Sequence, residues 1–231
     1  VAAMAADACG GEHVQGISMP SMYSSDGSKD DAADLAANLG AKYDVQPIEP
    51  LFVSYQKQLD LEGVAAENLQ ARIRGVIVMA YSNAKGLLAL ATGNKSELAC
   101  GYSTIYGDAV GGYAPIKDLL KTRVWEISRW RNKAAAAGVG IGGLGIVGNE
   151  RSGAGTPLPG GVMIPVNSIE KAPSAELRPG QKDSDSLPEY ALLDKVLAAY
   201  IEHAHGRADL LADGFDQVTV DTVMRLVDRA E

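Results

Sequence analysis

The sequence predicts an α/β fold, a Rossmann-like parallel sheet with flanking helices. Short apolar runs that suit strands alternate with segments whose apolar residues recur at helical spacing. Strands separated by helices of this length pair in parallel, through right-handed crossovers. At 231 residues and 46% apolar content, the chain has enough material for one sizeable core. We therefore expect a single domain over residues 1–231.

The elements of this fold can be read in order along the chain. Residues 1–11 have the composition of a helix body, and a strand over 14–20 follows. A helix over 28–40 ends on a glycine and leads into a second strand over 43–48. The middle of the chain shows a helix over 65–82, a strand over 87–92, a short helix from residue 95 and a helix over 117–132. Three amphipathic helices complete the pattern, over 187–203, 207–212 and 217–230.

Two segments break this pattern. Residues 134–166 are rich in glycine and small apolar side chains and keep a period of neither 2 nor 3.6. We expect them to form a flexible surface insertion. Residues 171–190 are polar and interrupted by prolines, which is typical of a loop. We expect a second polar loop there.

Charge and hydropathy exclude several classes of function. A net charge of −8 argues against general binding to nucleic acid or to an anionic membrane, although a local basic pocket remains compatible with it. No run approaches 18 uninterrupted apolar residues, and no secretory signal can be drawn at the start. We therefore expect a soluble, cytoplasmic protein.

Small polar residues follow the third predicted strand, in the stretch LATGNKSELACGYSTIYGD (90–108). Ligands bind outside the carboxyl ends of strands in an open parallel sheet. Thr92 offers a hydroxyl there, and Gly93 lets a ligand approach the backbone closely. Asn94 and Glu97 have the spacing of a helix capping box, which explains Glu97 by local structure alone. The hydroxyl and aromatic residues that follow favour a ligand site, so both interpretations of Glu97 stay open.

Four segments resemble, in order, the signature segments of NAD synthetase in its glutamine-dependent form: ENLQARIRG (67–75), LATGNKSELACGYSTIYGD (90–108), PIKDLLKTRV (115–124) and PSAELRPGQKDSDSLPEY (173–190). The resemblance implies an adenine nucleotide α-hydrolase-like fold and a ligase that amidates deamido-NAD. Such an enzyme makes an acyl-adenylate from deamido-NAD and ATP, then replaces AMP by ammonia taken from glutamine. ATP and Mg²⁺ are the implied cofactors. The resemblance also implies that RPGQKDSDS (178–186) is a loop that closes over the reacting groups, whereas its composition alone equally allows a solvated loop.

The resemblance also assigns site residues. It assigns ATP to Thr92, Lys121 and Ser174, and deamido-NAD to Asn68, Arg72, Glu97, Tyr102, Ser103, Thr104 and Ile105. In ammonia-dependent relatives the position of Glu97 is a magnesium ligand, and Mg²⁺ prefers one or two carboxylates together with phosphate oxygens. Metal and substrate therefore both remain open for Glu97. Lys121 is the cation suited to the departing pyrophosphate, so we expect Lys121 and Glu97 to be catalytic.

Helix geometry adds two expectations about the segment 67–83. Arg72 and Arg74 point about 200° apart on a helix, so at most one of them faces the site. The helix is apolar on more than one face, as expected of a helix buried against a partner. The resemblance implies that deamido-NAD lies across a two-fold interface. We therefore expect a homodimer or larger homo-oligomer built partly on this helix.

Some parts of the family pattern do not occur in this sequence. A Ser-Gly-Gly-x-Asp-Ser pyrophosphate loop is expected a few residues before Val1, and a glutaminase domain with its cysteine nucleophile is expected further upstream. We therefore expect the chain by itself to bind ATP poorly and to lack useful activity. Two alternatives remain. The first alternative is that the chain is a non-catalytic nucleotide-binding or assembly module. The second is that it is a relative such as GMP synthetase, which applies the same chemistry to another acid.

Overall fold

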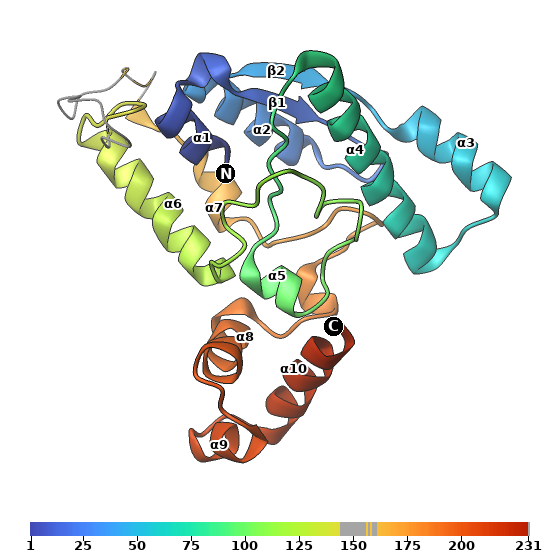
Figure 1. The fold of residues 1–231 in the computed structure, drawn as a ribbon, viewed down its shortest axis with the longest axis vertical. Helices are drawn as coiled ribbons and strands as arrows, with labels where there is room; N and C mark the ends of the chain where they lie inside the picture. The colour runs from blue at the N-terminus through green and yellow to red at the C-terminus, as the bar shows by residue number, and fades with distance from the viewer. Residues whose placement is uncertain (144–155, 157, 159–160, 231) are drawn as a thin grey trace.

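The computed structural model describes residues 1–143, 156, 158 and 161–230, which form a mixed α/β fold (Figure 1). Strands β1 (Gln15–Ser18) and β2 (Lys42–Val45) pair in parallel, with Gln15 opposite Lys42 and Ser18 opposite Val45. Helix α2 (Asp26–Leu39) makes the crossover between them. It begins at the Ser25 cap, whose hydroxyl accepts from the Ser28 N–H. The predicted strand, helix, strand unit is confirmed.

Helices supply most of the remaining structure. In chain order they are α1 (Ala2–Cys9), η1 (Gly11–His13), α3 (Glu49–Leu59), α4 (Gly63–Lys85), α5 (Lys95–Ala99), α6 (Lys121–Ala136), α7 (Val166–Glu170), η3 (Asp183–Asp185), α8 (Tyr190–Leu197), the π-helical turn η4 (Ala198–Glu202), α9 (Arg207–Ala212) and α10 (Gln217–Ala230). Figure 1 shows α8, α9 and α10 gathered at one end of the molecule, with the sheet at the other end. In the described part of the chain, no helix has both the length and the apolar character needed to cross a bilayer.

The third predicted strand, residues 87–92, is wrong. Only one bridge forms there, in which Leu90 pairs with Tyr113 in parallel. The Ala91 N–H donates to the Tyr113 carbonyl at 2.9 Å, and the Gly112 N–H donates to the Ala89 carbonyl at 2.8 Å. The partner is an irregular segment rather than a strand, so no regular ladder forms, and Leu88 within the run is 69% exposed. Helix α3 was not predicted at all.

Three clusters of buried apolar side chains hold the fold together. One lies among α5, α8, α9 and α10 and centres on Leu193, Val196, Leu197, Leu210, Val220 and Val223. A second joins α1, α2 and α6, and a third packs α3 against α4 through Phe52 and Ile73. Each cluster includes at least one helix that lines a large cavity: α5 in the first, α2 and α6 in the second, and α4 in the third.

The expectation of a surface insertion over 134–166 needs correction at both ends. Ala135 belongs to α6, and Ala135, Ile141 and Met163 are buried in the cluster of α1, α2 and α6. The Asn132 side chain also bonds both backbone polar groups of Ile164, at 2.7 and 2.9 Å. Small apolar side chains therefore fill a shared core without any helical or strand period. The centre of the segment, residues 144–155, 157 and 159–160, lies outside the described residues.

A buried ion pair ties the first helix to α6. Arg131 donates from Nε and Nη2 to the two carboxylate oxygens of Asp7, at 2.7 and 2.8 Å. Each side chain is only 4% exposed. Arg131 also donates to the Val139 and Gly140 carbonyls, and Asp7 accepts from the Gly142 N–H. These extra bonds compensate for removing two charges from water.

Replacing Asp7 by Asn is expected to lower the free energy of unfolding by about 3–5 kcal/mol, because it leaves a buried guanidinium without its counter-charge. Urea titration of the natural protein that carries this chain measures the change. Asp221→Asn is the matched control, since Asp221 pairs with Arg207 on the surface and its loss should have little effect. A small change for Asp7→Asn would show that the pair contributes little.

Candidate functional site

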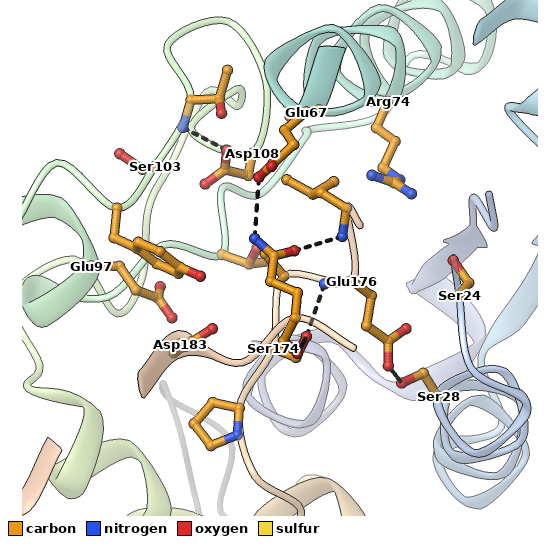
Figure 2. Close-up of a pocket in the computed structure, with 18 of the residues that line it drawn as sticks. Ser24, Ser28, Glu67, Arg74, Glu97, Ser103, Asp108, Ser174, Glu176 and Asp183 are labelled. Carbon is orange, nitrogen blue, oxygen red and sulfur yellow. Dashed lines mark hydrogen bonds between the residues drawn. The ribbon is translucent and has the colours of Figure 1, made fainter. Parts of the chain in front are cut away.

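A cavity of about 980 Å³ opens where the carboxyl end of β1 meets the amino ends of α2 and α6 (Figure 2). One side of α4, the segment 92–108 and the loop 171–186 complete its walls. The carboxyl edge of a parallel sheet and the positive ends of helices favour anionic ligands. The cavity therefore lies where the sequence predicted a nucleotide site.

Helix α4 presents one face to the cavity. Val64, Asn68, Ala71 and Arg74 line it at spacings of four and three residues, as positions on one side of a helix do. Glu67 lies on the same face and accepts from the Gln181 side chain at 3.2 Å. This face joins the helix to the loop 171–186.

Glu97 takes part in a helix cap and in an ion pair with Lys121. The predicted capping box of α5 is confirmed, because the Asn94 N–H donates to Glu97 Oε2 and the Glu97 N–H donates to Asn94 Oδ1, both at 3.1 Å. The other carboxylate oxygen accepts from Lys121 Nζ at 2.8 Å. Both side chains are 19% exposed, and Lys121 Nζ lies 5.4 Å from the centre of the Tyr190 ring. Lys121 is thus held against the cavity wall rather than freely solvated.

The amino end of α6 is held by two side chains from other helices. Ser96 Oγ accepts from the Lys121 N–H at 2.9 Å and donates to Asp194 Oδ1 at 2.6 Å. Asp194 Oδ2 accepts from the Thr122 N–H at 2.7 Å. Ser96 and Asp194 are buried, at 0% and 3% exposure. Two amides at the start of α6 therefore find partners in α5 and α8, which fixes the position of Lys121.

The segment 102–108 packs tightly against α4. Thr104 Oγ1 donates to Asn68 Oδ1 at 2.9 Å, and the Thr104 N–H donates to Asp108 Oδ1 at 2.7 Å. Burial raises the pKa of the Asp108 carboxyl, although its hydrogen bonds with Thr104 oppose that shift. Gly75 permits this packing, because a Cβ at that position would collide with the Tyr106 carbonyl oxygen.

Glu176 fastens the loop 171–186 to the start of α2. Its Oε1 accepts from Ser25 Oγ, Ser28 Oγ and Lys171 Nζ at 2.8, 2.7 and 2.8 Å, and its Oε2 accepts from the Ser25 N–H at 3.1 Å. Burial raises the pKa of this carboxyl, but hydrogen bonds from Lys171, Ser28 and Ser25 outweigh it and bring the pKa to about 2. The backbone of Glu176 is left-handed, at φ 49°. The same turn places Ser174, whose Oγ donates to the Gln181 carbonyl at 2.6 Å.

Two tyrosines flank one buried carboxylate of this loop. Tyr190 Oη donates to Asp183 Oδ2 at 2.9 Å, and Asp183 is 4% exposed. The Tyr102 hydroxyl and Asp183 Oδ1 are buried and form no hydrogen bond within the described structure. Burial, followed by the charge of Asp183, raises the pKa of both tyrosines. Both phenols are therefore neutral at physiological pH.

The structure brings eight of the ten predicted site residues to the cavity: Asn68, Thr92, Glu97, Tyr102, Ser103, Thr104, Lys121 and Ser174. Arg72 and Ile105 do not line it. They meet on the outer side of α4, where Arg72 Nε donates to the Ile105 carbonyl at 3.3 Å. Of the two arginines in this segment of α4, Arg74 lines the cavity. Sequence reasoning also missed Lys171, Glu176, Gln181 and Asp183, although it had identified residues 171–190 as a polar loop.

A magnesium ion would require carboxylate or phosphate oxygens. Within the described residues no group of three or more His, Cys, Asp or Glu side chains is arranged to hold a metal ion. Mg²⁺ does not need a cage made only of protein, since one carboxylate and the phosphates of a nucleotide suffice. Glu97 lines the cavity, but its Oε1 accepts from Lys121 and its Oε2 from the Asn94 N–H, so a magnesium ion would have to share one of these oxygens.

A parallel sheet with polar side chains and helix ends gathered at its carboxyl edge defines a nucleotide-binding α/β protein. The family model described as NAD synthase matches residues 1–231. The chain belongs to the NAD synthase family.

Similar proteins agree with this family. The chain is 46% identical to the glutamine-dependent NAD(+) synthetase of Rhodobacter capsulatus, over 98% of this chain, and 43% identical to that of Acinetobacter baylyi, over 99%. It spans only 39% of the length of either relative.

Solved structures show the same fold. A glutamine-dependent NAD+ synthetase from Acinetobacter baumannii, in complex with ADP, matches 98% of this chain at 39% identity and a TM-score of 0.60, and the match covers 37% of that protein. The NH3-dependent NAD synthetase of Campylobacter jejuni matches 94% of this chain at 24% identity and a TM-score of 0.68, over 73% of its own length. NAD synthetases use ATP, and the ADP complex supports nucleotide binding by this fold.

Glu176→Gln is expected to lower the free energy of unfolding at pH 7 by about 1–2 kcal/mol, a value reduced for partial exposure. The folded pKa of about 2 lies below the ordinary 4.5, so the carboxylate's contribution is complete above pH 4.5 and disappears as pH falls toward 2. Urea titrations at several pH values measure this. In Glu176→Gln, the free energy of unfolding should no longer fall because of this carboxyl group as the pH is lowered from 4.5 to 2. In Glu189→Gln, whose substitution is at an exposed position, that fall should remain. Equal pH dependence in wild type and Glu176→Gln would refute the assignment.

Proposed function

We propose that this chain is the synthetase domain, residues 1–231, of an enzyme that amidates deamido-NAD to NAD. The deamido-NAD carboxylate attacks the α-phosphorus of ATP, and pyrophosphate leaves. Ammonia from glutamine then attacks the acyl carbon, and AMP leaves with the bonding electrons. The observation that carries the proposal is the convergence of eight residues of the family segments on one cavity. Because all substrates are small water-soluble molecules, a cytoplasmic location is consistent with it.

We assign different walls of the cavity to the two substrates. Lys121, at the amino end of α6, and Thr92 both line the cavity, and a helix amino end suits the ATP phosphates. Ser174 lines the wall contributed by the loop 171–186 and, with Thr92 and Lys121, is assigned to ATP. Asn68 and residues 102–104 form the wall between α4 and α5, which we assign to deamido-NAD.

Lys121 and Glu97 supply the charge that the first step needs. As pyrophosphate departs, negative charge accumulates on its oxygens, and a lysine already positioned there stabilises it without reorganisation. Glu97 holds the lysine in place at 2.8 Å. When Mg²⁺ is bound, it supplies further neutralisation of phosphate charge, and Glu97 is the carboxylate that would hold it.

Lys121→Ala in the natural protein is expected to lower the rate of adenylation by about 10²-fold or more, on the order of 3 kcal/mol in activation free energy. Adenylation is measured as pyrophosphate release from ATP and deamido-NAD without an ammonia donor. Lys85→Ala is the control, since Lys85 pairs with Asp44 on the surface. Wild-type pyrophosphate release by Lys121→Ala would refute the role of this lysine. ADP binding without any release by the wild type would favour the non-catalytic module instead.

We also propose a homodimer formed through the outer face of α4. Val76 is 69% exposed and Met79 37% exposed, neither lines the cavity, and Ile105, at 68%, lies beside the same helix through its contact with Arg72. Exposed apolar side chains on one helix face are typical of an interface. An interface here would bring Arg72 and Ile105, which lie outside the cavity, close to a partner.

Sedimentation of the natural protein at micromolar concentration is expected to show a dimer or larger species, because this apolar face would otherwise remain in water. Val76→Asp should shift the protein toward monomer, since it places a charge in the proposed interface. Val218→Asp should not, although Val218 on α10 is exposed to a similar extent, at 75%. A monomeric wild type would remove the proposal.

A further inference from the structure

The cationic side chains around the cavity differ in whether a carboxylate pairs with them. Among the described residues, five cationic side chains line the cavity, and four are paired with a carboxylate: Lys29 with Asp26, Lys121 with Glu97, Lys171 with Glu176, and Arg178 with Glu67 and Asp185. Arg74 is the fifth, and it forms no ion pair with any of the described residues.

The backbone holds Arg74 in position at the sheet edge. Its Nε donates to the Met19 carbonyl at 2.9 Å, directly after β1. Its two terminal amino groups make no hydrogen bond with the described residues. Figure 2 shows the guanidinium directed away from α4, toward the region of Glu176 and Ser24. Both terminal groups are therefore available to a ligand.

Burial makes this unpaired charge costly. Burial lowers the pKa of Arg74, and the nearby charge of Glu176 only partly opposes that shift. Glu176 does not complete the pairing, because both of its oxygens already accept from Ser25, Ser28 and Lys171. A half-buried cation without a counter-charge is stabilised when an anion binds beside it.

We propose that Arg74 binds a phosphate group of the nucleotide that occupies the cavity. The inference rests on the proposed function only in assuming that the ligand is a nucleotide. The guanidinium fork matches two phosphate oxygens, and the carboxyl end of β1 is where phosphates bind in this class of sheet. The phosphate can belong to the mononucleotide or to the pyrophosphate bridge of the dinucleotide.

Calorimetric titration of the natural protein with ADP, NAD and adenosine tests the proposal. Arg74→Gln should weaken ADP or NAD binding at least 10-fold and leave adenosine binding unchanged, because adenosine has no phosphate. Loss with ADP alone assigns the mononucleotide phosphate, and loss with NAD alone assigns the dinucleotide bridge. The proposal would be overturned if Arg74→Gln bound both ADP and NAD as tightly as wild type does. It would also be overturned if the variant lost adenosine affinity as strongly as it lost ADP or NAD affinity.

Two further variants separate charge from structure. Arg74→Lys keeps the charge and should retain part of the affinity, and it also serves if Arg74→Gln fails to fold. Raising the salt concentration should weaken ADP or NAD binding less in Arg74→Gln than in wild type, because one ionic contact is gone. An unchanged salt dependence would count against the proposal. Arg129→Gln, at an exposed position on α6, should behave as wild type.

The outcome is independent of catalysis. If wild type fails to form NAD, yet Arg74→Gln still weakens ADP binding, the phosphate site stands and the proposed reaction fails. If wild type forms NAD and Arg74→Gln binds every ligand normally, the proposed reaction stands and the phosphate site at Arg74 fails.

Discussion

The arrangement of the site depends on the buried hydrogen bonds that join α5, α6 and α8. Ser96 and Asp194 accept hydrogen bonds from the first two backbone N–H groups of α6. These bonds place Lys121 against Glu97. Glu97 is itself fixed by the cap of α5. Because these groups are buried, removing one would leave another without a partner, which is costly in a low-dielectric interior. This end of the cavity is therefore a corner where three helices are joined by buried hydrogen bonds.

The opposite wall is built differently. The loop 171–186 has little regular structure, and it is attached to α2 by the charge of Glu176 and to α4 by the Gln181 amide. Side-chain contacts of this kind break more easily than a packed apolar core does. A nucleotide held here would lie between a rigid wall and one attached by polar contacts, which suits a site that must admit and release large substrates.

Local patterns were the most predictable part of the structure. The spacing of Asn94 and Glu97 predicted a capping box because the signal lies within four residues. Helical geometry correctly limited the cavity to one of Arg72 and Arg74, but the choice between them depends on how α4 packs, which no local pattern contains. Residues 87–92 failed as a strand for the same reason, since an apolar run does not specify its pairing partner. The segment 134–166 shows no helical or strand period, and its residues Ile141 and Met163 fill a space shared by three helices.

Arg74 links binding to the persistence of the fold. A protein that keeps an uncompensated cation in its cavity gives up stability whenever the cavity is empty, and recovers it when an anion arrives. The folded population would then follow the supply of nucleotide, so a cell short of nucleotide would expose this chain to unfolding and proteolysis sooner. Selection for tight ligand recognition at Arg74 thus acts against selection for a durable empty state.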